Sequence, residues 1–498
     1  MALTTSMEGV PRKAAADRTV ALAWSQRLDL LVHALAQLPD DVTLEVDATH
    51  PDLRHVELLA TAYGIRDRIA IGEASEAPEG RIRRSLPPLS PVAPPSFGSF
   101  RSMAELVQSL SRPDDPPASL RFRDGVFAGQ RIALITNVPA HYRLPLFAGM
   151  ERRIHDGGGD FRVFFLGTRA SSRPWLVRDL AEEFPHEFLT SLELPIGSRR
   201  RLVPLALERR LRAFRPTLLL SGGFSPAVSG RVARFAGRAR VPWGIWSGET
   251  AQMNTAASGA RRRQRLALAR SAAFGIAYGH RAGEYLKELR SDLPVVYGRN
   301  TAPTAAAAGG GAPEAGDLEL LFVGDLADRR KGVDVALEAL RRNRELRCRL
   351  TVVGSGRLLS SVAEQAREDR RVRFAGALSP DETRRLYAAA DIFLFPTRSD
   401  VFGLVLVEAL GAGIATIASD AAGSVDDVAI NGHNSVVLSA HDPDAWAGAI
   451  AALAEDARRR VALGDEGALT IRRRWTIAHA VDAMVAGLRL ALLNGDAT

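Results

Sequence analysis

Cysteine is almost absent from this sequence, since Cys348 is the only one in 498 residues. A single thiol excludes an internal disulfide framework and any metal site built from clustered cysteines. Cys348 stands between two arginines just before the apolar run LTVV, which predicts a thiol within a strand.

Long apolar runs are absent as well. No stretch approaches the roughly 20 apolar residues that span a bilayer, so we expect no transmembrane helix. The N-terminus, MALTTSMEGVPRKAAADR, lacks the apolar central segment of a secretory signal. We therefore predict a cytoplasmic protein.

Positive charge is in excess. The chain has a formal charge of +8, and arginine runs such as RRRQR at 261–265 and RRR at 472–474 contribute to it. Such charge attracts anionic partners, which include nucleotides, nucleic acids and an acidic membrane face. Solvated helix faces are the first interpretation, and peripheral contact with the inner face of an anionic membrane is the second. Nucleic acid is not expected as a partner, because no nucleic-acid module accompanies the charge.

Two stretches without a packing pattern divide the chain. They are the proline-rich SLPPLSPVAPPSFGS at 85–99 and the alanine- and glycine-rich TAPTAAAAGGGAPEAG at 301–316. A length of 498 residues suggests about three units. We predict an N-terminal α/β extension at 1–84, a Pro-rich linker at 85–127, an α/β domain at 128–300, a linker at 301–316, a second α/β domain at 317–474 and a final helix at 475–498.

Short apolar runs that end in small residues alternate with helical patterns in both α/β domains. In the first domain they include RIALITNV (131–138), TLLLSGG (217–223), VPWGIWSG (241–248) and FGIAYG (274–279). In the second they are LELLFVG (318–324), RLTVVGSG (349–356), VRFAG (372–376), DIFLFPT (391–397) and IATIAS (414–419). This alternation predicts two doubly wound parallel sheets, whose ligands bind beyond the carboxyl ends of the strands.

The first segment contains an echo of the last domain. RLDLLVHALAQLPDDVTLEV (27–46) parallels GVDVALEALRRNRELRCRLTVV (332–353), and RIAI (68–71) parallels VRFA (372–375). The extension therefore resembles a half-repeat of the C-terminal domain, and chance similarity of amphipathic segments is the alternative. We expect no catalysis in it, because it has no counterpart of residues 400–423.

Residues 400–423, DVFGLVLVEALGAGIATIASDAAG, carry the strongest chemical signal. Asp400 and Glu408 stand eight residues apart across a loop-to-helix turn, and a strand and a glycine-bearing turn follow. Carboxylates accept hydrogen bonds from sugar or ribose hydroxyls, and a backbone turn can hold phosphate, so this order predicts a sugar-nucleotide site. There are two alternatives to a sugar-nucleotide site. Glu408 could be an acid near a helix start that the helix dipole favours, or the two carboxylates could be the catalytic pair of a glycosidase.

These residues resemble the signature of the retaining glycosyltransferases of family 4, also called group 1. Asp400, Phe402-Gly403, Glu408 and the turn 420–423 match it in order and spacing, over a resemblance that extends from about 128 to 493. The resemblance implies a GT-B fold, in which two Rossmann-like domains face a cleft. It also implies that Glu408 binds the ribose and that Asp400, where glutamate is usual, lies beside the donor sugar.

The resemblance implies further donor-binding residues. Lys331 matches a phosphate-binding lysine, whereas Asp325 stands where arginine is usual, so we expect Arg329 or Arg330 to replace that contact. The remaining expected donor-binding residues are Gly324, Gly354, Phe402, Gly403, Leu404, Gly423 and Ser424, with Ala422 in place of a usual glycine. Lys331, Asp400 and Glu408 are the predicted catalytic set.

On the acceptor side, the loop NVPAHYRLPLF (137–147) resembles the family's first loop, so His141 and Arg143 are candidate contacts, and Glu249 is a third. We find no metal-ligand cluster and no DxD pair, and expect a metal-independent reaction without a cofactor. The predicted activity moves a hexose from a nucleotide-diphosphate sugar to a saccharide, lipid-linked or natural-product hydroxyl, as in polysaccharide biosynthesis. A catalytically silent GT-B scaffold and a GT-B sugar phosphorylase or epimerase are the alternatives.

Overall fold

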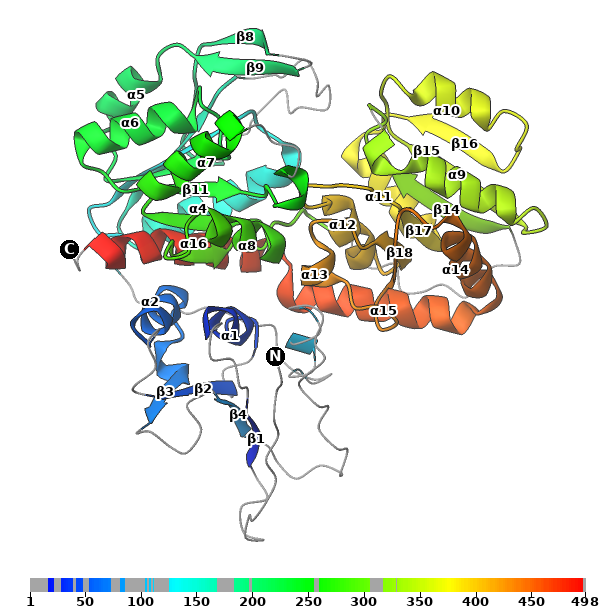
Figure 1. Ribbon diagram of the computed structural model, residues 1–498, viewed down its shortest axis with the longest axis horizontal. Helices are drawn as coiled ribbons and strands as arrows, with labels where there is room; N and C mark the ends of the chain where they lie inside the picture. The colour runs from blue at the N-terminus through cyan, green and yellow to red at the C-terminus, as the bar shows by residue number, and fades with distance from the viewer. Residues whose placement is uncertain are drawn as a thin grey trace.

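The protein is described by a computed structural model covering residues 17–21, 28–38, 42–47, 53–72, 81–85, 104, 107–108, 111, 125–167, 183–196, 199–254, 259–304, 317–327 and 329–495. It contains two large α/β domains side by side and a smaller α/β unit below the first of them (Figure 1). Both large domains have the parallel sheets that the sequence predicts.

The N-terminal domain is built on a parallel sheet of seven strands in the order β13-β12-β11-β10-β5-β6-β7. Its central strands are buried on both faces, as expected for runs such as RIALIT and WGIWS. The strands are β5 (Arg131–Thr136), β6 (Asp160–Phe165), β7 (His186–Phe188), β10 (Leu218–Gly222), β11 (Trp243–Ser247), β12 (Phe274–Ala277) and β13 (Val295–Tyr297). The helices are η3 (His141–Arg143), α4 (Leu144–Asp156), α5 (Leu207–Phe214), α6 (Ser229–Ala239), η4 (Gln252–Asn254), α7 (Gly259–Ser271) and α8 (His280–Leu289), and a hairpin joins β8 (Ser191–Ile196) to β9 (Arg199–Pro204).

The C-terminal domain has a parallel sheet of six strands in the order β16-β15-β14-β17-β18-β19. The strands are β14 (Leu318–Val323), β15 (Cys348–Val353), β16 (Val372–Gly376), β17 (Ile392–Phe395), β18 (Ala415–Ser419) and β19 (Val436–Leu438). The helices are η5 (Arg329–Lys331), α9 (Val333–Arg342), α10 (Leu359–Gln365), α11 (Pro380–Ala389), α12 (Leu404–Ala412), α13 (Val425–Val428), α14 (Pro443–Glu455) and α15 (Ala457–Arg474). The chain order reverses direction between β14 and β17, which is where such sheets bind ligands.

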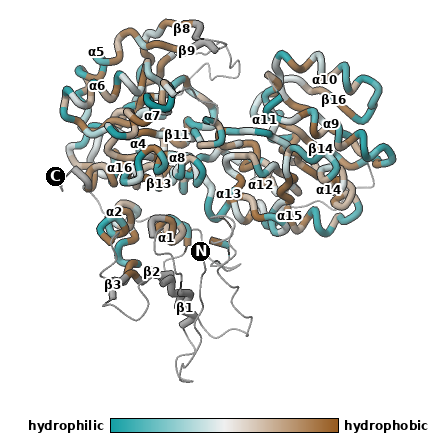
Figure 2. Tube along the Cα trace, in the orientation of Figure 1, coloured by the Kyte–Doolittle hydropathy of each residue, from teal (hydrophilic) through white to brown (hydrophobic). Residues whose placement is uncertain are grey.

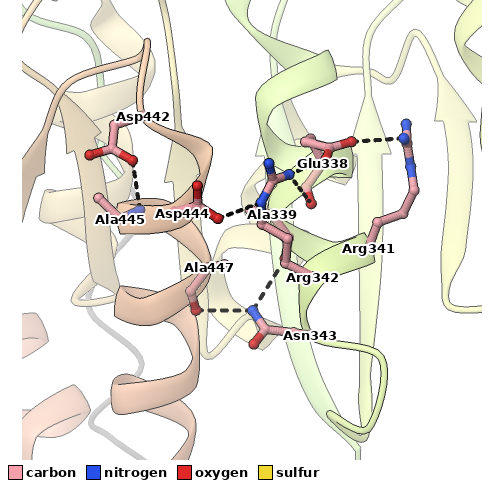
Figure 3. Close-up of polar contacts among 9 residues, drawn as sticks. All are labelled: Glu338, Ala339, Arg341, Arg342, Asn343, Asp442, Asp444, Ala445 and Ala447. Carbon is pink, nitrogen blue, oxygen red and sulfur yellow. Dashed lines mark hydrogen bonds and ion pairs between the residues drawn. The ribbon is translucent and has the colours of Figure 1, made fainter.

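Two details of this domain follow from its sequence. Cys348 is the first residue of β15, as predicted, and burial raises the pKa of its thiol to about 11. Polar contacts tie α9 to α14: Arg342 Nε donates to Asp444 Oδ1 at 2.6 Å, and Asn343 Nδ2 donates to the Ala447 carbonyl at 2.9 Å (Figure 3). These contacts hold α14 against α9.

The last helix, α16 (Ile477–Gly495), returns to the N-terminal domain and lies beneath its sheet (Figure 1). It packs against α4 and the strands β12 and β13, and Val481, Met484 and Leu488 are part of that domain's core. Within Ala457–Leu493 an 18-residue window is long and apolar enough to cross a membrane, but 72% of it is buried inside the protein. The apolar character of α16 thus matches its packing in the core.

The N-terminal extension has the order of elements that the sequence echo predicts. Its elements are β1 (Asp17–Ala21), α1 (Leu28–Leu35), β2 (Val42–Asp47), α2 (Leu53–Tyr63), η1 (Arg66–Arg68), β3 (Ile69–Gly72) and β4 (Arg81–Ser85). β2 and β3 pair in parallel and are joined by α2, as β15 and β16 are joined by α10. The extension differs in one respect, because the strand beside β2 is β4, which runs antiparallel, whereas β14 runs parallel to β15.

The extension packs on α16, which lies between it and the N-terminal sheet. Buried arginines of the main domain donate to carbonyls at the helix ends of the extension: Arg489 to Ala62 at 2.9 Å and Arg299 to Ala36 at 2.9 Å. The Tyr63 hydroxyl accepts from the Tyr297 amide at 3.3 Å. These contacts make the extension continuous with the core.

The predicted linkers lie partly outside the described residues. Phe127, at the end of the segment 85–127, is buried in the core of the N-terminal domain, and Ala104 and Val107 are also buried. Thr301 and Ala302 are buried at the start of the segment 301–316, while 305–316 lie outside the described residues.

Candidate functional site

A cavity of about 590 Å³ lies beyond the carboxyl ends of β14 and β15, with the N-terminal domain contributing to its wall. This is the position that a doubly wound sheet predicts for a ligand. The cavity combines an apolar part with a small set of polar side chains. Its lining residues are His141, Pro303, Val323, Gly324, Asp325, Lys331, Val353, Gly354, Ser355, Ala377, Leu378, Pro380, Asp381, Thr383, Arg384, Tyr387, Val405 and Glu408.

Lys331 and Asp400 come from different strand ends and meet in an ion pair. Lys331 closes the loop after β14, and its Nζ donates to Asp400 Oδ2 in the loop after β17. Both side chains are largely shielded from solvent, with exposed fractions of 20% and 12%. Lys331 lines the cavity, whereas Asp400 does not. In this structure Asp400 therefore acts on the cavity through Lys331.

Glu408 lies on α12, in its second turn, and its carboxylate lines the cavity. The Tyr387 hydroxyl, on α11, donates to Glu408 Oε2 at 3.2 Å. Burial raises the pKa of Glu408 to about 7, although Tyr387 and the charge of Arg384 act in the opposite direction. This position removes the alternative reading of Glu408 as a first-turn acid favoured by the helix dipole. The carboxylate is a buried acceptor that faces a cavity.

Arg384 is a cation of the cavity wall that the sequence did not single out. It lies on α11 and pairs with Asp381, one turn earlier on the same helix. About half of its side chain is exposed. Tyr387 was missed for the same reason: both belong to DETRRLYAA, which reads as an ordinary amphipathic helix and has no motif. Only the fold shows that α11 borders the cavity.

Two glycines are required by the backbone at this site. Gly354 has a φ of +146°, and a Cβ there would lie 1.9 Å from the carbonyl oxygen of Gly324. Gly403 has a φ of +88°, and a Cβ there would lie 2.6 Å from the Phe395 ring. Both values lie in the region that favours glycine. Gly324 and Gly354 line the cavity, while Gly403 begins α12 behind it.

The residues next to Gly403 have packing roles. Phe402 is buried and its ring contacts Trp475 at a centroid distance of 5.9 Å. Leu404 is the first residue of α12 and does not line the cavity, whereas its neighbour Val405 does. Among the described residues, Phe402 and Leu404 thus support the wall rather than form it.

The loop after β14 holds Asp325, which stands where the family usually has an arginine. It also holds Arg329 and Arg330, one of which the sequence analysis expects to replace that arginine. Asp325 lines the cavity, and its Oδ1 accepts from the Ala327 amide at 2.8 Å. Arg329 and Arg330 are exposed on η5 and are not among the lining residues. Their carbonyls accept from Arg398, at 2.9 Å for Arg329 and 2.7 Å for Arg330. Arg384 is the arginine that reaches the cavity.

The turn after β18 packs against the loop that carries Asp400. A Cβ on Gly423 would lie 2.3 Å from the Val401 carbonyl oxygen, so glycine is needed for this approach. Ala422 is fully buried, forms a bridge with Asp400 and has no positive φ, so alanine fits where a second glycine was expected. The Ser424 amide already donates to the Phe402 carbonyl at 2.8 Å, and Gly423 and Ser424 do not line the cavity.

The predicted acceptor residues separate into one cavity residue and two that lie elsewhere. His141 lines the cavity from the N-terminal domain, and its Nδ1 is buried without a hydrogen-bond partner among the described residues. Burial, and then the charge of Arg384, lower the pKa of His141. A neutral imidazole with a buried ring nitrogen thus faces the cavity.

Arg143 and Glu249 make contacts within the N-terminal domain. The Arg143 guanidinium lies 4.5 Å from the centroid of the Trp246 ring and donates to the Tyr278 hydroxyl. Glu249 accepts from Arg265 Nε at 2.7 Å. Neither lines the cavity, so the structure does not bring these two together with Lys331 and Glu408.

The two domains are joined beside the cavity by a polar contact between α8 and α13. The carboxylate of Asp427 accepts from the His280 amide at 2.9 and 3.1 Å, and Arg281 forms a two-bond ion pair with Asp426 at 2.6 and 3.0 Å. Burial raises the pKa of Asp427 well above its usual range. One ion pair and the hydrogen bonds of one buried carboxyl group therefore link the two domains.

No group of three or more histidine, cysteine, aspartate or glutamate residues in the described part of the chain is placed to hold a metal ion.

Comparison with known proteins agrees with this geometry. Residues 317–456 match the family model described as Glycosyl transferases group 1. The D-inositol 3-phosphate glycosyltransferase of Corynebacterium kroppenstedtii is 34% identical over 161 residues, which are 29% of this chain and 35% of that protein. The glycogen synthase of Mycobacterium tuberculosis is 33% identical over 180 residues, which are 35% of this chain and 43% of that protein. The chain thus spans less than half the length of these relatives.

Solved structures show the same fold over more of the chain. The HepE protein of Anabaena in complex with UDP and glucose has a TM-score of 0.55 at 17% identity and covers 71% of this chain and 98% of its own. The sucrose-phosphate synthase of Thermosynechococcus elongatus has a TM-score of 0.53 at 18% identity and covers 74% and 98%. The predicted fold class, GT-B, is confirmed.

Proposed function

We propose that the protein transfers a hexose from a nucleotide-diphosphate sugar to a hydroxyl acceptor, with retention at the anomeric carbon, because residues 317–456 match the family model described as Glycosyl transferases group 1. The observation that carries the proposal is the meeting of Lys331, Arg384 and Glu408 in one cavity beyond the strand ends. A carboxylate for ribose hydroxyls and cations for a diphosphate are the groups that such a donor requires.

The lining residues suggest an orientation for the donor. Glu408 would accept hydrogen bonds from the ribose, and the apolar residues Val353, Ala377 and Leu378 would contact the base. Lys331, held by Asp400, would stabilise the charge that develops on the departing diphosphate. That phosphate can take the acceptor's proton, so the reaction needs positioning and charge stabilisation rather than a separate base.

His141 lies on the acceptor side of this arrangement. Its neutral imidazole reaches the cavity from the opposite domain and would bond a hydroxyl of the donor sugar or of the acceptor. The acceptor class remains as broad as the sequence predicts: a saccharide, a lipid-linked sugar or a natural-product hydroxyl. Because a structural neighbour was solved with UDP and glucose, UDP-glucose is the first donor to test.

Calorimetry with purified protein tests the proposal. Titration with a panel of nucleotide sugars should give one donor that binds, and Glu408→Ala should weaken that donor by about 10- to 100-fold, as expected for hydrogen bonds to a charged group. Glu368→Ala, which removes an exposed carboxylate of the same domain, is the matched control and should bind normally. Unchanged affinity in Glu408→Ala would refute the ribose assignment.

A second candidate is a catalytically silent GT-B scaffold, and one observation favours it. Both cations of the cavity wall are already paired with carboxylates, Lys331 with Asp400 and Arg384 with Asp381, and Asp325 adds a further negative charge. Such a wall attracts a diphosphate less than unpaired cations would. Absence of both transfer and donor hydrolysis across the whole panel would favour the scaffold.

A further inference from the structure

One face of the N-terminal domain combines unpaired positive charge with exposed hydrophobic side chains. It is formed by the β8–β9 hairpin and the helices α5 and α6, which lie together on the side opposite the extension (Figure 1). We call it the α5–α6 face. None of its side chains contributes to the cavity described above.

Positive charge predominates on this face. Residues 207–241 contain eight arginines and one acidic residue, Glu208. Glu208 pairs with Arg231, and Arg210 pairs with Glu187. The other six arginines are exposed, and no carboxylate in the described part of the chain lies within ion-pair distance of them: they are Arg209, Arg212, Arg215, Arg234, Arg238 and Arg240.

The arrangement of these arginines follows from the helices. Both α5 and α6 are amphipathic, because Leu211 and Phe235 are buried while most of the arginines are exposed. Hydrophilic and hydrophobic residues are mixed along both helices (Figure 2). Between the C-terminal ends of the two helices lies a cavity of about 410 Å³. Its lining combines apolar side chains such as Leu211 and Phe235 with Arg212, Arg215 and Arg238, and with Glu208, which is paired with Arg231. Guanidinium groups around a recess of this kind suit a phosphate-bearing headgroup.

Hydrophobic side chains project beside the arginines. Five large hydrophobic residues are exposed in the described part of the chain, and four of them belong to the hairpin region: Phe188, Leu192, Leu194 and Leu205. Glu193 pairs with Leu202 across the hairpin, and Leu202 packs against the core. Because side chains alternate along a strand, Leu192 and Leu194 share the opposite, outer face of β8. Soluble surfaces scatter such residues singly, so four together indicate a contact.

The hairpin and the helices are fixed to each other. Arg231 on α6 donates to the Pro204 carbonyl at the end of β9 and also pairs with Glu208 on α5. Arg210 on α5 pairs with Glu187 on β7, and the Leu205 amide donates to the Thr190 carbonyl at 2.8 Å. Charge and hydrophobic side chains are therefore presented by one rigid unit.

We propose that the α5–α6 face docks onto an anionic lipid bilayer, with its arginines on the headgroups and the hairpin leucines among the acyl chains. Charge alone would suit a nucleic acid or an acidic protein equally well. The exposed leucines of the hairpin, which Arg231 joins to α6, favour lipid, because nucleic acids offer the leucines no apolar surface outside their stacked bases. This docking is separate from the proposed transfer reaction and does not depend on it.

Vesicle co-sedimentation with the full chain tests the docking. Phosphatidylcholine vesicles that contain phosphatidylglycerol should bind the protein, and pure phosphatidylcholine vesicles should not. The variant Arg212→Glu/Arg215→Glu/Arg238→Glu should bind at least about 100-fold more weakly, since each lost basic residue removes about a fivefold factor and each new glutamate adds repulsion. The variant Leu192→Ser/Leu194→Ser should bind at low salt but be released when the salt is raised, because only its charge contact remains.

Matched controls separate this face from general charge. Arg344→Glu/Arg370→Glu/Arg458→Glu makes the same change of charge on exposed arginines of the C-terminal domain, and Val461→Ser removes the remaining exposed hydrophobic side chain. Both should bind as the wild type does. Unaltered thermal unfolding of every variant shows that the fold is kept.

Four outcomes would overturn the proposal. The first is equal binding to neutral and anionic vesicles, and the second is equal loss of binding in the test and control arginine variants. The third is binding to duplex DNA or RNA without binding to vesicles. Soluble inorganic phosphate should not displace the protein from vesicles at matched ionic strength; displacement, the fourth outcome, would mean that the face binds free phosphate instead.

Discussion

Substitution Glu408→Gln should make the protein more stable at pH 8 while weakening the donor. In the folded protein burial raises the pKa of Glu408 to about 7 from the usual 4.5. The folded state then binds a proton more tightly than the unfolded state, so this group lowers the free energy of unfolding as the pH rises through the window from about 4.5 to 7. The loss is complete above pH 7 and absent below 4.5.

The magnitude follows from that displacement. A difference of about 2.5 pKa units corresponds to about 3 kcal/mol, and a glutamine at this position avoids the loss. For a domain of this size about 3 kcal/mol raises the melting temperature by roughly 6 to 12 °C at pH 8, and the two proteins should melt together near pH 4.5. The Tyr387 hydroxyl can still donate to the amide oxygen of the glutamine.

Donor affinity should change in the opposite direction. An ionised carboxylate accepts hydrogen bonds from both ribose hydroxyls, so wild-type affinity should fall about tenfold between pH 8 and pH 6 as Glu408 is protonated. In Glu408→Gln affinity should be lower and nearly independent of pH. Scanning calorimetry and titration calorimetry at matched pH measure both quantities. Equal melting temperatures at pH 8, or wild-type affinity that does not vary with pH, would refute the reasoning.

Three other variants extend the test. Lys331→Met should weaken a nucleoside diphosphate by about 10- to 100-fold in titration calorimetry, because a charged hydrogen bond to phosphate is lost; equal affinity would exclude a phosphate contact. Arg281→Ala should change kcat and KM together in steady-state assays, because it breaks the ion pair with Asp426 that joins the domains; a change confined to KM would argue against this. Tyr63→Phe should lower the free energy of unfolding by about 1 to 3 kcal/mol in urea titrations, because the buried Tyr297 amide and the His33 ring each lose a partner; the control Tyr142→Phe should unfold as the wild type does.

The fold could be predicted because its signals are local. Each central strand is a short apolar run that ends in small residues, and the two parallel sheets have the predicted strands at 131–138 and 318–324. The order of α1, β2, α2 and β3 could also be read from the echo of the last domain. The antiparallel β4 could not, because strand neighbours depend on pairing between segments distant in sequence.

The candidate site was predictable where the motif fixes the backbone and unpredictable where the fold brings distant segments together. Lys331 and Glu408 line the cavity as expected. Arg384 and Tyr387 were missed, because nothing in an amphipathic helix shows which cavity it borders. The place of Arg143 outside the cavity could not be read from the sequence for a related reason, since the attraction of its guanidinium to the Trp246 ring depends on tertiary packing.

The unusual Asp400 is consistent with its contact in the fold. An aspartate is shorter than the usual glutamate by one methylene group, and here its carboxylate reaches Lys331 but not the cavity. The ion pair fixes the ammonium group of Lys331 at the cavity wall, which a flexible lysine would not achieve alone, because ordering its side chain costs about 2 kcal/mol of entropy. The same pair neutralises the charge that a diphosphate would seek. Asp400 therefore fixes the position of the Lys331 ammonium group but weakens its attraction for a phosphate. Asp325 and Asp381 add negative charge to the cavity wall, which weakens the attraction for a phosphate further. Under the proposed function, a site built in this way would gain its selectivity from the fit of the ribose and base to Glu408 and the apolar lining more than from phosphate charge.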